Sequence, residues 1–500
     1  MDTISFWEGT AREAAFPSLT QDEEADVVII GGGITGITAA HLLSRAGKRV
    51  VVLEALRVGL GTTGYSTGNL YATVDNGLYR VRDKWDQETA AAVAKSRGET
   101  IDRIERVAAE YDLPCRFVRR PHYLLATEDS QLEPMEQEFG AARDAGLAAE
   151  LVDEAPLPVP AIRALRIESQ AQFHPVIFVR MLAKAIASER CRIFENSGVI
   201  AIDDEAMTVT TAGGTVRAGK ILLATHTPKG FNILQTELGP YREYGIAADL
   251  AEDRYPEGIF WTFEEPGHSI RSYDADGTKY LIVIGEKHKT GQHDDTDYYE
   301  KVEAFARSHF PVKRIAYRWS AQHYRPADEL PYIGRSTASG DVYVATGFGT
   351  NGLVYGPLAA AILTDDILGR KNPWSDLYDA RRFTPAKSAG SFVRENVNVA
   401  GQYVRDYLTA ADVEKLENIA PGEGSLATIE GEKYAVYRDE NGRWTALSPV
   451  CTHLGCIVHW NRLEKSWDCP CHGSRFRCDG EVLEGPAMAA LKKKEIREQP

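Results

Sequence analysis

The sequence lacks the features that mark several large classes of protein. It contains no run of about 18 consecutive apolar residues, the minimum for a membrane-spanning helix, so we predict no such span. Residues 1–17 lack the basic segment and apolar stretch of a signal peptide, and we therefore expect a cytoplasmic protein. Positive charge is scarce: 57 Lys and Arg oppose 72 Asp and Glu, and the net charge of −15 argues against a nucleic-acid partner.

Long internal repeats and low-complexity tracts are also missing from the sequence. What is present is the composition of a globular protein, with 43% hydrophobic residues. A chain of 500 residues is too long for a single core, so we expect two or three domains.

The chain is organised around residues 27–54. Residues 27–30 (Val-Val-Ile-Ile) have the length and β-branched content of a buried parallel strand, and Gly31, Gly33 and Gly36 follow in G-x-G-x-x-G spacing. A helix over 38–46 and a second buried strand come next, ending in Glu54, an acid placed to bind a ribose hydroxyl. The glycines alone would be a weak signal, but all these parts in register predict dinucleotide binding.

Two further stretches favour FAD over NAD. The Gly-, Thr- and Ser-rich segment 57–69 is able to lie against a long cofactor. Far downstream, a strand over 342–346 leads into a second glycine turn, 347–352, and then a helix over 358–368. A flavin uses such a second anchor, because N–H groups and a positive helix end stabilise its anionic reduced ring.

At this point the sequence resembles the D-amino-acid-oxidase-like family of FAD-dependent amine and amino-acid oxidoreductases. The resemblance covers about residues 5–385 and includes Leu330-Pro331-Tyr332-Ile333-Gly334 and segment 347–357. It implies that FAD is the cofactor and that a C–N bond is oxidised. The residues expected to contact FAD are Gly31, Gly33, Ile34, Thr35, Gly36, Glu54, Ala55, Thr62, Thr63, Gly64, Ser66, Thr67, Val199, Ala224, Thr225, Gly347, Phe348, Gly349, Thr350, Asn351 and Gly352.

The C-terminal part contains a second cofactor motif. Its two loops read Cys451-Thr452-His453-Leu454-Gly455-Cys456 and Cys469-Pro470-Cys471-His472-Gly473-Ser474. Two Cys and two His suit either zinc or a [2Fe–2S] centre. The extra cysteine in each loop, the flanking Gly and Pro and the lack of a His-x₃₋₅-His pair favour iron and sulfur over zinc.

This motif resembles the Rieske domain over residues 415–490. The resemblance implies that Cys451 and Cys469 bind one iron of a [2Fe–2S] cluster and that His453 and His472 bind the other. It further implies a disulfide between Cys456 and Cys471. Respiratory Rieske proteins typically place a serine and a tyrosine hydroxyl beside the cluster. Here the serine is kept as Ser474 but Phe476 replaces the tyrosine, which predicts a lower reduction potential.

The expected fold class is α/β plus an all-β module. We expect a Rossmann-like FAD-binding domain with an inserted antiparallel-sheet substrate domain, as in D-amino-acid oxidase and glutathione reductase, and then a small Rieske β-sandwich. The predicted oxidoreductase covers 1–385, with FAD-binding parts at about 20–110, 150–235 and 325–385 and the substrate domain at about 111–150 and 236–324. A helical linker, 386–414, joins it to the Rieske domain, 415–500.

The two predicted cofactors suggest the chemistry. A flavin accepts a hydride, whereas a Rieske centre moves one electron, so a fused cluster makes sense if it empties the flavin. Sarcosine-oxidase-like enzymes hold a lysine over the flavin to promote reaction with oxygen. Aligning on the glycines puts Val283 at that position, although Lys287 and Lys289 lie close by. We therefore favour a dehydrogenase that reduces a soluble acceptor protein over two alternatives, an oxygen-using oxidase and a non-catalytic electron relay.

The substrate contacts are less constrained by the sequence. Tyr244, Arg271 and His288 are the candidates for catalysis in the pocket above the flavin, with Arg325 and Asn351 next. Arg271 could bind a substrate carboxylate through two hydrogen bonds, or could instead form a surface salt bridge. No acid or base is singled out, because this family transfers a hydride without a strong protein base.

Overall fold

The structure is a computed structural model. It describes residues 4–495 except 231, 264–265, 293–295, 338–339, 383, 385–386, 389–394, 400, 403–412 and 414–415. The predicted helical linker, 386–414, therefore lies for the most part outside the described residues. In the described part, every helix is too short or too polar to cross a membrane.

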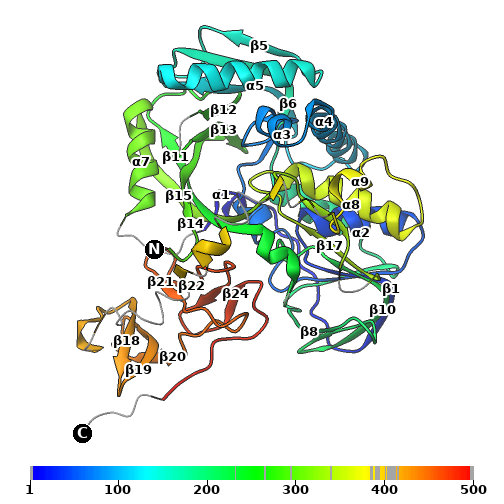
Figure 1. The fold of residues 1–500 in the computed structure, drawn as a ribbon, viewed down its shortest axis with the longest axis vertical. Helices are drawn as coiled ribbons and strands as arrows, with labels where there is room; N and C mark the ends of the chain where they lie inside the picture. Colours follow the sequence, from blue (N-terminus) through cyan, green and yellow to red (C-terminus); the bar gives the residue numbers. More distant parts are fainter. Residues whose placement is uncertain are drawn as a thin grey trace.

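An eight-stranded sheet forms the first domain, at the lower right of Figure 1. Its strand order is β16-β17-β10-β1-β2-β7, and β8 and β9 extend it beside β10. The central strands are parallel and almost fully buried, as the apolar runs predicted. Its strands are β1 (Glu23–Ile30), β2 (Val50–Leu53), β7 (Cys191–Phe194), β8 (Val199–Asp203), β9 (Thr208–Thr211), β10 (Gly214–Leu223), β16 (Tyr332–Arg335) and β17 (Val342–Thr346).

A nine-stranded sheet forms the second domain, above the first in Figure 1. Its order is β15-β11-β14-β13-β12-β4-β6-β3, with β5 paired to β6, and most of its pairs are antiparallel. The strands are β3 (Asn69–Leu70), β4 (Val118–Ala126), β5 (Ala149–Val152), β6 (Arg163–Gln172), β11 (Leu238–Leu250), β12 (Ile259–Thr262), β13 (Ser269–Ala275), β14 (Thr278–Lys289) and β15 (Val312–Pro326).

The predicted domain division differs from the strand pairing in two places. The first is β3, which falls within the predicted FAD-binding part 20–110 but pairs with β6 of the nine-stranded sheet. The second FAD-binding part was expected to begin at about residue 150, but β5 and β6 pair within the nine-stranded sheet. Because β6 ends at Gln172, that boundary lies near residue 173. The alternating pattern of this segment is that of a half-buried strand, which sequence alone does not assign to either sheet.

The helices cover the two sheets. Near the eight-stranded sheet, α2 packs on α8, where a Cβ added to Gly356 would lie 2.7 Å from Thr35 Oγ1. The helices are α1 (Phe6–Gly9), α2 (Ile34–Arg45), α3 (Leu78–Lys84), α4 (Gln87–Glu110), α5 (Leu132–Asp144), α6 (Pro175–Ile186), α7 (Tyr298–His309), α8 (Gly352–Ile367) and α9 (Ser375–Tyr378). Short 3₁₀ turns occur at η1 (Thr62–Tyr65), η2 (Asp129–Gln131), η3 (Ile233–Glu237) and η4 (Leu416–Asn418).

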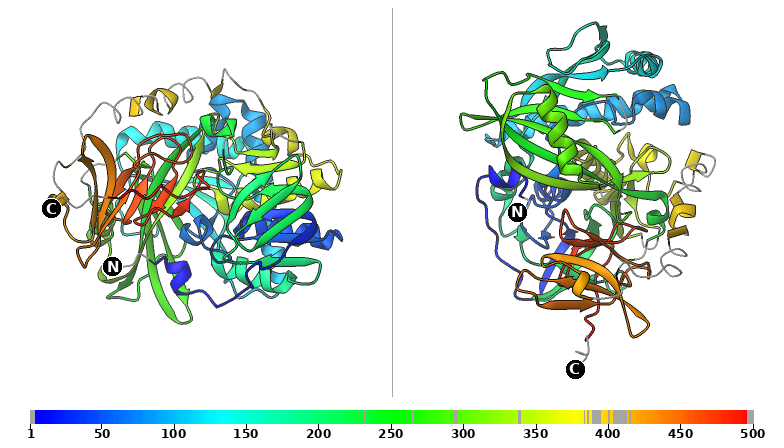
Figure 2. Two further views of the ribbon diagram at one scale, coloured as in Figure 1. Left: turned by 90° about the horizontal axis from the view of Figure 1, so that it is seen from below. Right: turned by 90° about the vertical axis from the view of Figure 1, so that its left-hand side faces the viewer.

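The C-terminal module consists of two small antiparallel sheets, at the lower left of Figure 1. The first contains β18 (Glu423–Ile429), β19 (Glu432–Arg438) and β20 (Trp444–Leu447). The second contains β21 (His459–Asn461), β22 (Ser466–Asp468), β23 (Arg475–Arg477) and β24 (Val482–Glu484). The two further views in Figure 2 show that this module lies against the oxidoreductase part rather than apart from it.

Glu138 links α5 to the beginning of α3 inside the second domain. Its carboxylate accepts a hydrogen bond from the backbone N–H of Tyr79 at 3.0 Å, and burial raises the pKa of Glu138 to about 7. A raised carboxyl pKa contributes stability that is fully present below the unfolded value and is lost as the pH rises through 7. We therefore expect Glu138→Gln to stabilise the protein at pH 8.5 by up to about 3 kcal/mol, because the variant has no carboxylate to keep buried and ionised.

Thermal unfolding at two pH values measures this effect. The melting temperature of the Glu138→Gln variant should exceed that of the wild type by several degrees at pH 8.5 and should match it near pH 5. Glu136→Gln, an exposed change on the same helix, is the control and should leave the melting temperature unchanged. Equal shifts of the two variants at pH 8.5 would refute this account of Glu138.

Candidate functional site

The first glycine turn joins β1 to α2. Gly31 has a φ of 110°, and a Cβ added there would lie 2.4 Å from the backbone oxygen of Ala224. A Cβ on Gly36 would lie 1.9 Å from the backbone oxygen of Gly31. Gly33 precedes α2 and has no side chain to cap it; apart from the N–H of Ile34, which donates to Thr63 Oγ1, this leaves backbone N–H groups of the first turn available to a phosphate. The turn therefore needs glycine where the sequence has it.

Polar groups from neighbouring loops surround this turn. The Glu54 carboxylate accepts hydrogen bonds from the backbone N–H groups of Gly32 at 2.7 Å and Leu56 at 2.9 Å, and burial raises its pKa. Thr63 Oγ1 accepts from the N–H of Ile34 at 3.1 Å, which places η1 against the beginning of α2. Ala224 donates its N–H to Ile30 at 2.9 Å, so the end of β10 borders the same turn. This set of donors and acceptors fits an adenine dinucleotide.

The second glycine turn, 347–352, lies beside the first because α8 packs on α2. Gly347 and Gly349 have φ values of 75° and 55°, which favour glycine. Asn351 precedes α8 without capping it; its amide donates to Asp75 at 2.7 Å and accepts from Arg97 at 2.9 Å. The structure thus brings both helix beginnings to one edge of the eight-stranded sheet, as two-point binding of FAD requires.

The loops 451–456 and 469–474 have the same backbone turn. Gly455 donates its N–H to Cys451 at 3.0 Å, and Gly473 donates to Cys469 at 3.1 Å. A disulfide joins Cys456 to Cys471, the pairing implied by the Rieske resemblance. The sulfurs of Cys456, Cys469 and Cys471 lie within 4.8 Å of one another, but two of them are in the disulfide. Cys469 and Cys451 therefore supply the thiols that remain for a metal.

The four expected cluster ligands converge at these loops. The thiols of Cys451 and Cys469 are hydrogen-bonded, and this contact lowers the pKa of Cys451 to about 7. The rings of His453 and His472 have their centroids 5.0 Å apart, and burial lowers the pKa of His472 to about 4. Two thiols and two neutral imidazoles are the donor set of a Rieske cluster. The residues present fit that group.

Ser474 and Phe476 lie beside these thiols. The Ser474 hydroxyl donates to Cys451 and accepts from the N–H of Ala487 at 3.0 Å, and Phe476 is fully buried in the same cluster of side chains. Because hydrogen bonds to a ligating sulfur stabilise the reduced cluster, we expect Ser474→Ala to lower the reduction potential by about 50 mV and Phe476→Tyr to raise it by tens of mV.

Redox titration of the iron–sulfur signal, followed by electron paramagnetic resonance, measures both shifts. Trp444→Phe, a change at a partly exposed side chain of the same module, is the control and should not move the potential. Shifts of the same sign for Ser474→Ala and Phe476→Tyr would contradict the hydrogen-bond explanation.

The cluster loops pack directly against β11 and β15 of the oxidoreductase part. The Tyr324 hydroxyl lies 3.3 Å from the backbone oxygen of His472 and 3.2 Å from that of Gly485. Gln322 donates to the backbone oxygen of Gly473 at 2.9 Å. The Gln235 carbonyl lies 3.0 Å from His453 Nε2, so this ring donates from Nε2 and keeps the Nδ1 lone pair available to a metal.

Tyr324 also reaches the second glycine turn. Its backbone oxygen accepts a hydrogen bond from the N–H of Gly349 at 2.9 Å. The Tyr324 ring packs edge-on against His226, 4.7 Å between centroids, and His226 contacts both Thr62 at 3.1 Å and Glu484 at 3.0 Å. A single residue therefore separates the turn expected to hold the flavin from the backbone of a cluster ligand.

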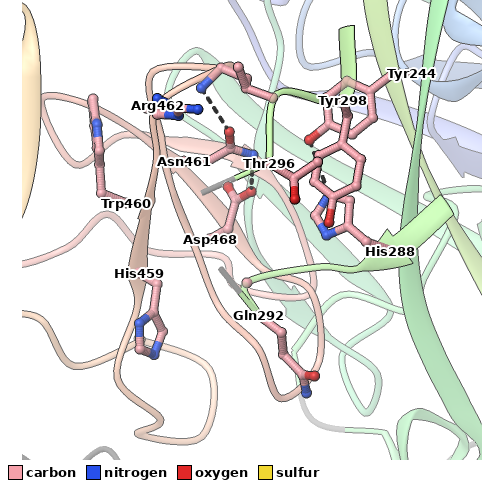
Figure 3. Close-up of a pocket in the computed structure, with 12 residues that line it drawn as sticks. Tyr244, His288, Gln292, Thr296, Tyr298, His459, Trp460, Asn461, Arg462 and Asp468 are labelled. Atoms are coloured by element: carbon pink, nitrogen blue, oxygen red, sulfur yellow. Dashed lines mark hydrogen bonds between the residues drawn. The ribbon is translucent and has the colours of Figure 1, made fainter. Parts of the chain in front are cut away.

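The three predicted catalytic residues lie outside the two glycine turns and the cluster loops, at two separate positions. Tyr244 and His288 are hydrogen-bonded at 3.0 Å and line a small pocket of about 20 Å³ between the nine-stranded sheet and residues 459–463 of the C-terminal module (Figure 3). Arg271 is 1% exposed; it donates to the backbone oxygen of Gly68 at 2.6 Å and lies over Trp7. Arg271 thus holds the segment after η1, and a catalytic role for these three residues stays a prediction.

A larger cavity of about 110 Å³ lies on the opposite face of the nine-stranded sheet. Glu243 and Lys287, the sequence neighbours of Tyr244 and His288, line it together with Thr350 of the second glycine turn. His122 and Trp261 complete a further part of its wall. From the sequence, Lys287 was considered only as a neighbour of the oxygen-activating position, and Glu243, His122 and Trp261 were not identified, since only the direction of each side chain from its strand distinguishes them from their neighbours.

Comparisons with known proteins identify a family for each of the two parts of the chain. Residues 26–366 match the FAD dependent oxidoreductase family, DAO, and residues 409–495 match the Rieske [2Fe-2S] domain. A Bacillus subtilis protein named as a Rieske 2Fe-2S iron-sulfur protein, YhfW, is 32% identical over 494 residues, which cover 98% of this chain and 97% of that protein.

Two further relatives match the oxidoreductase part. The gamma-glutamylputrescine oxidoreductase of Escherichia coli is 26% identical over 408 residues, covering 76% of this chain and 90% of its own. The solved structure of glycine oxidase from Geobacillus kaustophilus superimposes with a TM-score of 0.60 at 18% identity, covering 72% of this chain and 100% of its own. The latter similarity supports the fold.

Proposed function

The chain belongs to the FAD dependent oxidoreductase family and carries a C-terminal Rieske [2Fe-2S] domain, and on this basis we propose that it is an amine or amino-acid dehydrogenase. Its cofactors are FAD and a [2Fe–2S] cluster. When bound, FAD supplies a hydride acceptor and the cluster supplies a one-electron carrier. The chain would oxidise a C–N bond and pass the electrons singly to a soluble acceptor protein.

We assign the cofactor contacts to residues of both domains. Gly31, Gly33 and the open beginning of α2 would hold the pyrophosphate, and Glu54 would bind a ribose hydroxyl. The turn 347–352 and the beginning of α8 would stabilise negative charge on the flavin ring. Cys451 and Cys469 would bind one iron, and His453 and His472 the other. The FAD contacts fall in the proposed oxidoreductase part, residues 1–385, and the cluster ligands fall in the proposed Rieske domain, residues 415–500.

The observation that carries this proposal is the packing of the cluster loops on the flavin side of the oxidoreductase. Tyr324 hydrogen-bonds to Gly349 through its backbone and to the His472 carbonyl through its hydroxyl. The side-chain carbonyl of Gln235, also in the oxidoreductase part, hydrogen-bonds to Nε2 of His453. Because electron transfer slows steeply with distance, a cluster that serves the flavin has to face it, and these contacts support that arrangement.

The substrate side supports an amine. Two relatives have names that refer to gamma-glutamylputrescine and glycine, both of which contain a C–N bond to oxidise. In this chain, Asp75 and Glu243 line the cavity next to Thr350. The charges of Arg325 and Lys287, with a smaller contribution from the hydrogen bond to Asn351, keep the pKa of Asp75 low despite its burial, so the wall is charged at neutral pH.

One observation favours the oxidase alternative. The position aligned with the oxygen-activating lysine holds Val283, which is fully buried. A lysine nevertheless lies at the cavity, because the ammonium group of Lys287 is close enough to lower the pKa of Asp75 in the cavity wall. If Lys287 has the role of that lysine, the enzyme would use oxygen and the Rieske domain would be structural.

An anaerobic screen of amines and amino acids tests the proposal and separates the two alternatives. We expect an active amine to bleach the flavin and then to reduce the cluster, and in air we expect an added one-electron acceptor to be reduced faster than peroxide forms. Rapid release of peroxide with the cluster still oxidised, slowed by Lys287→Met, would show that the enzyme is an oxidase. If no amine bleaches the flavin, the amine proposal fails.

A further inference from the structure

The second ligand loop, residues 469–474, packs so closely against the oxidoreductase part that a side chain would not fit between them. A Cβ added to Gly473 would lie 2.7 Å from the Cβ of Pro240. On the other side of the contact, a Cβ added to Gly291 would lie 2.6 Å from the backbone nitrogen of Pro470. Glycine on each side of the contact therefore lets the ligand loop sit directly on the oxidoreductase backbone.

Tyr324 joins this ligand loop to the second glycine turn. Its backbone oxygen accepts a hydrogen bond from the N–H of Gly349 at 2.9 Å. Its hydroxyl lies 3.3 Å from the backbone oxygen of His472 and 3.2 Å from that of Gly485. The residue is 2% exposed, so this connection is shielded from bulk water. One residue thus reaches from the turn expected to hold the flavin to the backbone of an expected cluster ligand.

The first ligand loop is connected to a different part of the oxidoreductase. His453 is hydrogen-bonded through Nε2 to the side-chain carbonyl of Gln235 at 3.0 Å. The Gln235 amide in turn donates to the backbone oxygens of Pro228 at 2.9 Å and Gly230 at 2.7 Å. These residues follow β10 and belong to neither glycine turn. The contacts of the second ligand loop therefore offer the shorter connection to the flavin side.

We propose that Tyr324 is the bridge through which electrons pass from the reduced flavin to the cluster, entering it on the side of His472. The proposal rests on the function proposed above and adds the route that the electrons take. Electrons tunnel faster through covalent and hydrogen bonds than across a gap between non-bonded atoms, and Tyr324 supplies such bonds. Gln322 is a positioning residue, because its amide donates to the Tyr324 hydroxyl and to the Gly473 oxygen, each at 2.9 Å.

The electrons and protons of this step balance. Each transfer oxidises the flavin by one electron and reduces the cluster by one electron. A hydride taken from the substrate leaves two electrons on the flavin, so two transfers are needed, and the acceptor protein reoxidises the cluster between them. Together the two transfers return the flavin to its oxidised form and release one proton to solvent.

The test compares two buried tyrosines whose hydroxyls cross the same interface. Tyr324→Phe keeps the ring and removes the hydroxyl from the second ligand loop. Tyr299→Phe is the matched control, because the Tyr299 hydroxyl donates to Glu464 of the C-terminal module at 2.6 Å, outside both ligand loops. Each variant loses an interface hydrogen bond, so a general loosening of the interface would affect both.

The measurement uses the full-length protein loaded with FAD and iron. The flavin is reduced by light without oxygen or substrate, and the absorbance of the cluster is followed. We expect Tyr324→Phe to slow the first-order reduction of the cluster several-fold and Tyr299→Phe to keep the wild-type rate. Redox titration should give wild-type potentials for both cofactors in Tyr324→Phe, since the hydroxyl contacts backbone oxygens and no ligating atom.

A second pair of variants tests the route without changing Tyr324. The methyl group of Gly291→Ala should push the second ligand loop away from the oxidoreductase part and slow the transfer, with iron and FAD content retained. Gly277→Ala is its control, because Gly277 has a similar positive φ, 91° against 70°, but nothing lies within 4 Å of the added Cβ. The backbone strain is thus shared, and Gly277→Ala should keep the wild-type rate.

Four results would overturn the proposal. They are a wild-type rate in Tyr324→Phe or in Gly291→Ala, equal slowing in Tyr324→Phe and Tyr299→Phe, slowing fully explained by a shifted potential, and a wild-type cluster that the reduced flavin never reduces. No substrate is used, so a failure of the amine assignment is distinguishable. In that case no amine would bleach the flavin, but Tyr324→Phe would still slow the light-driven transfer.

Discussion

Replacing Cys469 by serine should remove the iron–sulfur cluster and leave the flavin in place. The iron content is expected to fall from about two atoms per chain to near zero, since the cluster depends on thiolate ligands and Cys469 is one of the two outside the disulfide. FAD content should stay at one per chain, because both glycine turns follow strands of the eight-stranded sheet and not of the C-terminal module. Anaerobic flavin reduction by an active amine should continue, while reduction of the external acceptor protein should fall to background.

The control for this prediction is a cysteine of the same module. Cys478→Ser changes a partly exposed thiol that follows β23, outside both ligand loops, and should retain iron and acceptor reduction. Iron and zinc are measured together by elemental analysis. If wild-type protein contains one zinc and no iron, or if Cys469→Ser still reduces the acceptor at the wild-type rate, the assigned role of the cluster is wrong.

Replacing Gly31 by alanine should abolish FAD binding. The added methyl group would lie 2.4 Å from the backbone oxygen of Ala224, and the φ of 110° is itself unfavourable for any residue with a side chain. Neither backbone can yield without separating β1 from β10, the strands that form the cofactor edge. We expect purified Gly31→Ala protein to be colourless in the flavin range after subtraction of the iron–sulfur spectrum.

A second glycine separates the clash from the backbone strain. Gly47, just after α2, has a φ of 84°, but nothing lies within 4 Å of its added Cβ. Gly47→Ala should therefore cost about 1 kcal/mol of stability and keep full FAD content. Retention of the iron–sulfur spectrum by Gly31→Ala would show that the C-terminal module is still folded. Normal FAD content in Gly31→Ala would contradict the assigned binding turn.

Much of the fold could be predicted from residue patterns. The buried strand, glycine turn, helix and acid of residues 27–54 appear as β1, α2, β2 and Glu54, since short-range sterics and burial determine that unit. The helix expected over 358–368 corresponds to the later part of α8, which spans 352–367. The two Cys-His loops were recognisable because metal ligands are restricted to a few residue types at close spacing.

The direction of the substrate-facing side chains could not be predicted. Successive residues of a strand point to opposite faces, and β11 and β14 are out of regular register between Arg242 and Tyr244. At this bulge Glu243 lies opposite both Glu286 and Lys287. A one-residue irregularity of this kind leaves Tyr244 and His288 on one face and Glu243 and Lys287 on the other.

The contacts between the C-terminal module and the oxidoreductase part could not be predicted from the sequence either. Gln235 and Tyr324 belong to no motif, and their importance arises only because the C-terminal module packs where they lie. Arg271 was a candidate substrate ligand because a guanidinium can bind a carboxylate through two hydrogen bonds, yet its partners include the backbone oxygens of Thr67 and Gly68. Long-range packing decides such roles, and no local pattern encodes it.

Light-driven reduction of the flavin under anaerobic conditions, without any substrate, tests most directly whether the two cofactors exchange electrons within one chain. Cluster reduction should follow flavin reduction with a first-order rate that does not change when the protein is diluted tenfold. A cluster that stays oxidised beside a fully reduced flavin, or a rate proportional to protein concentration, would contradict internal electron transfer.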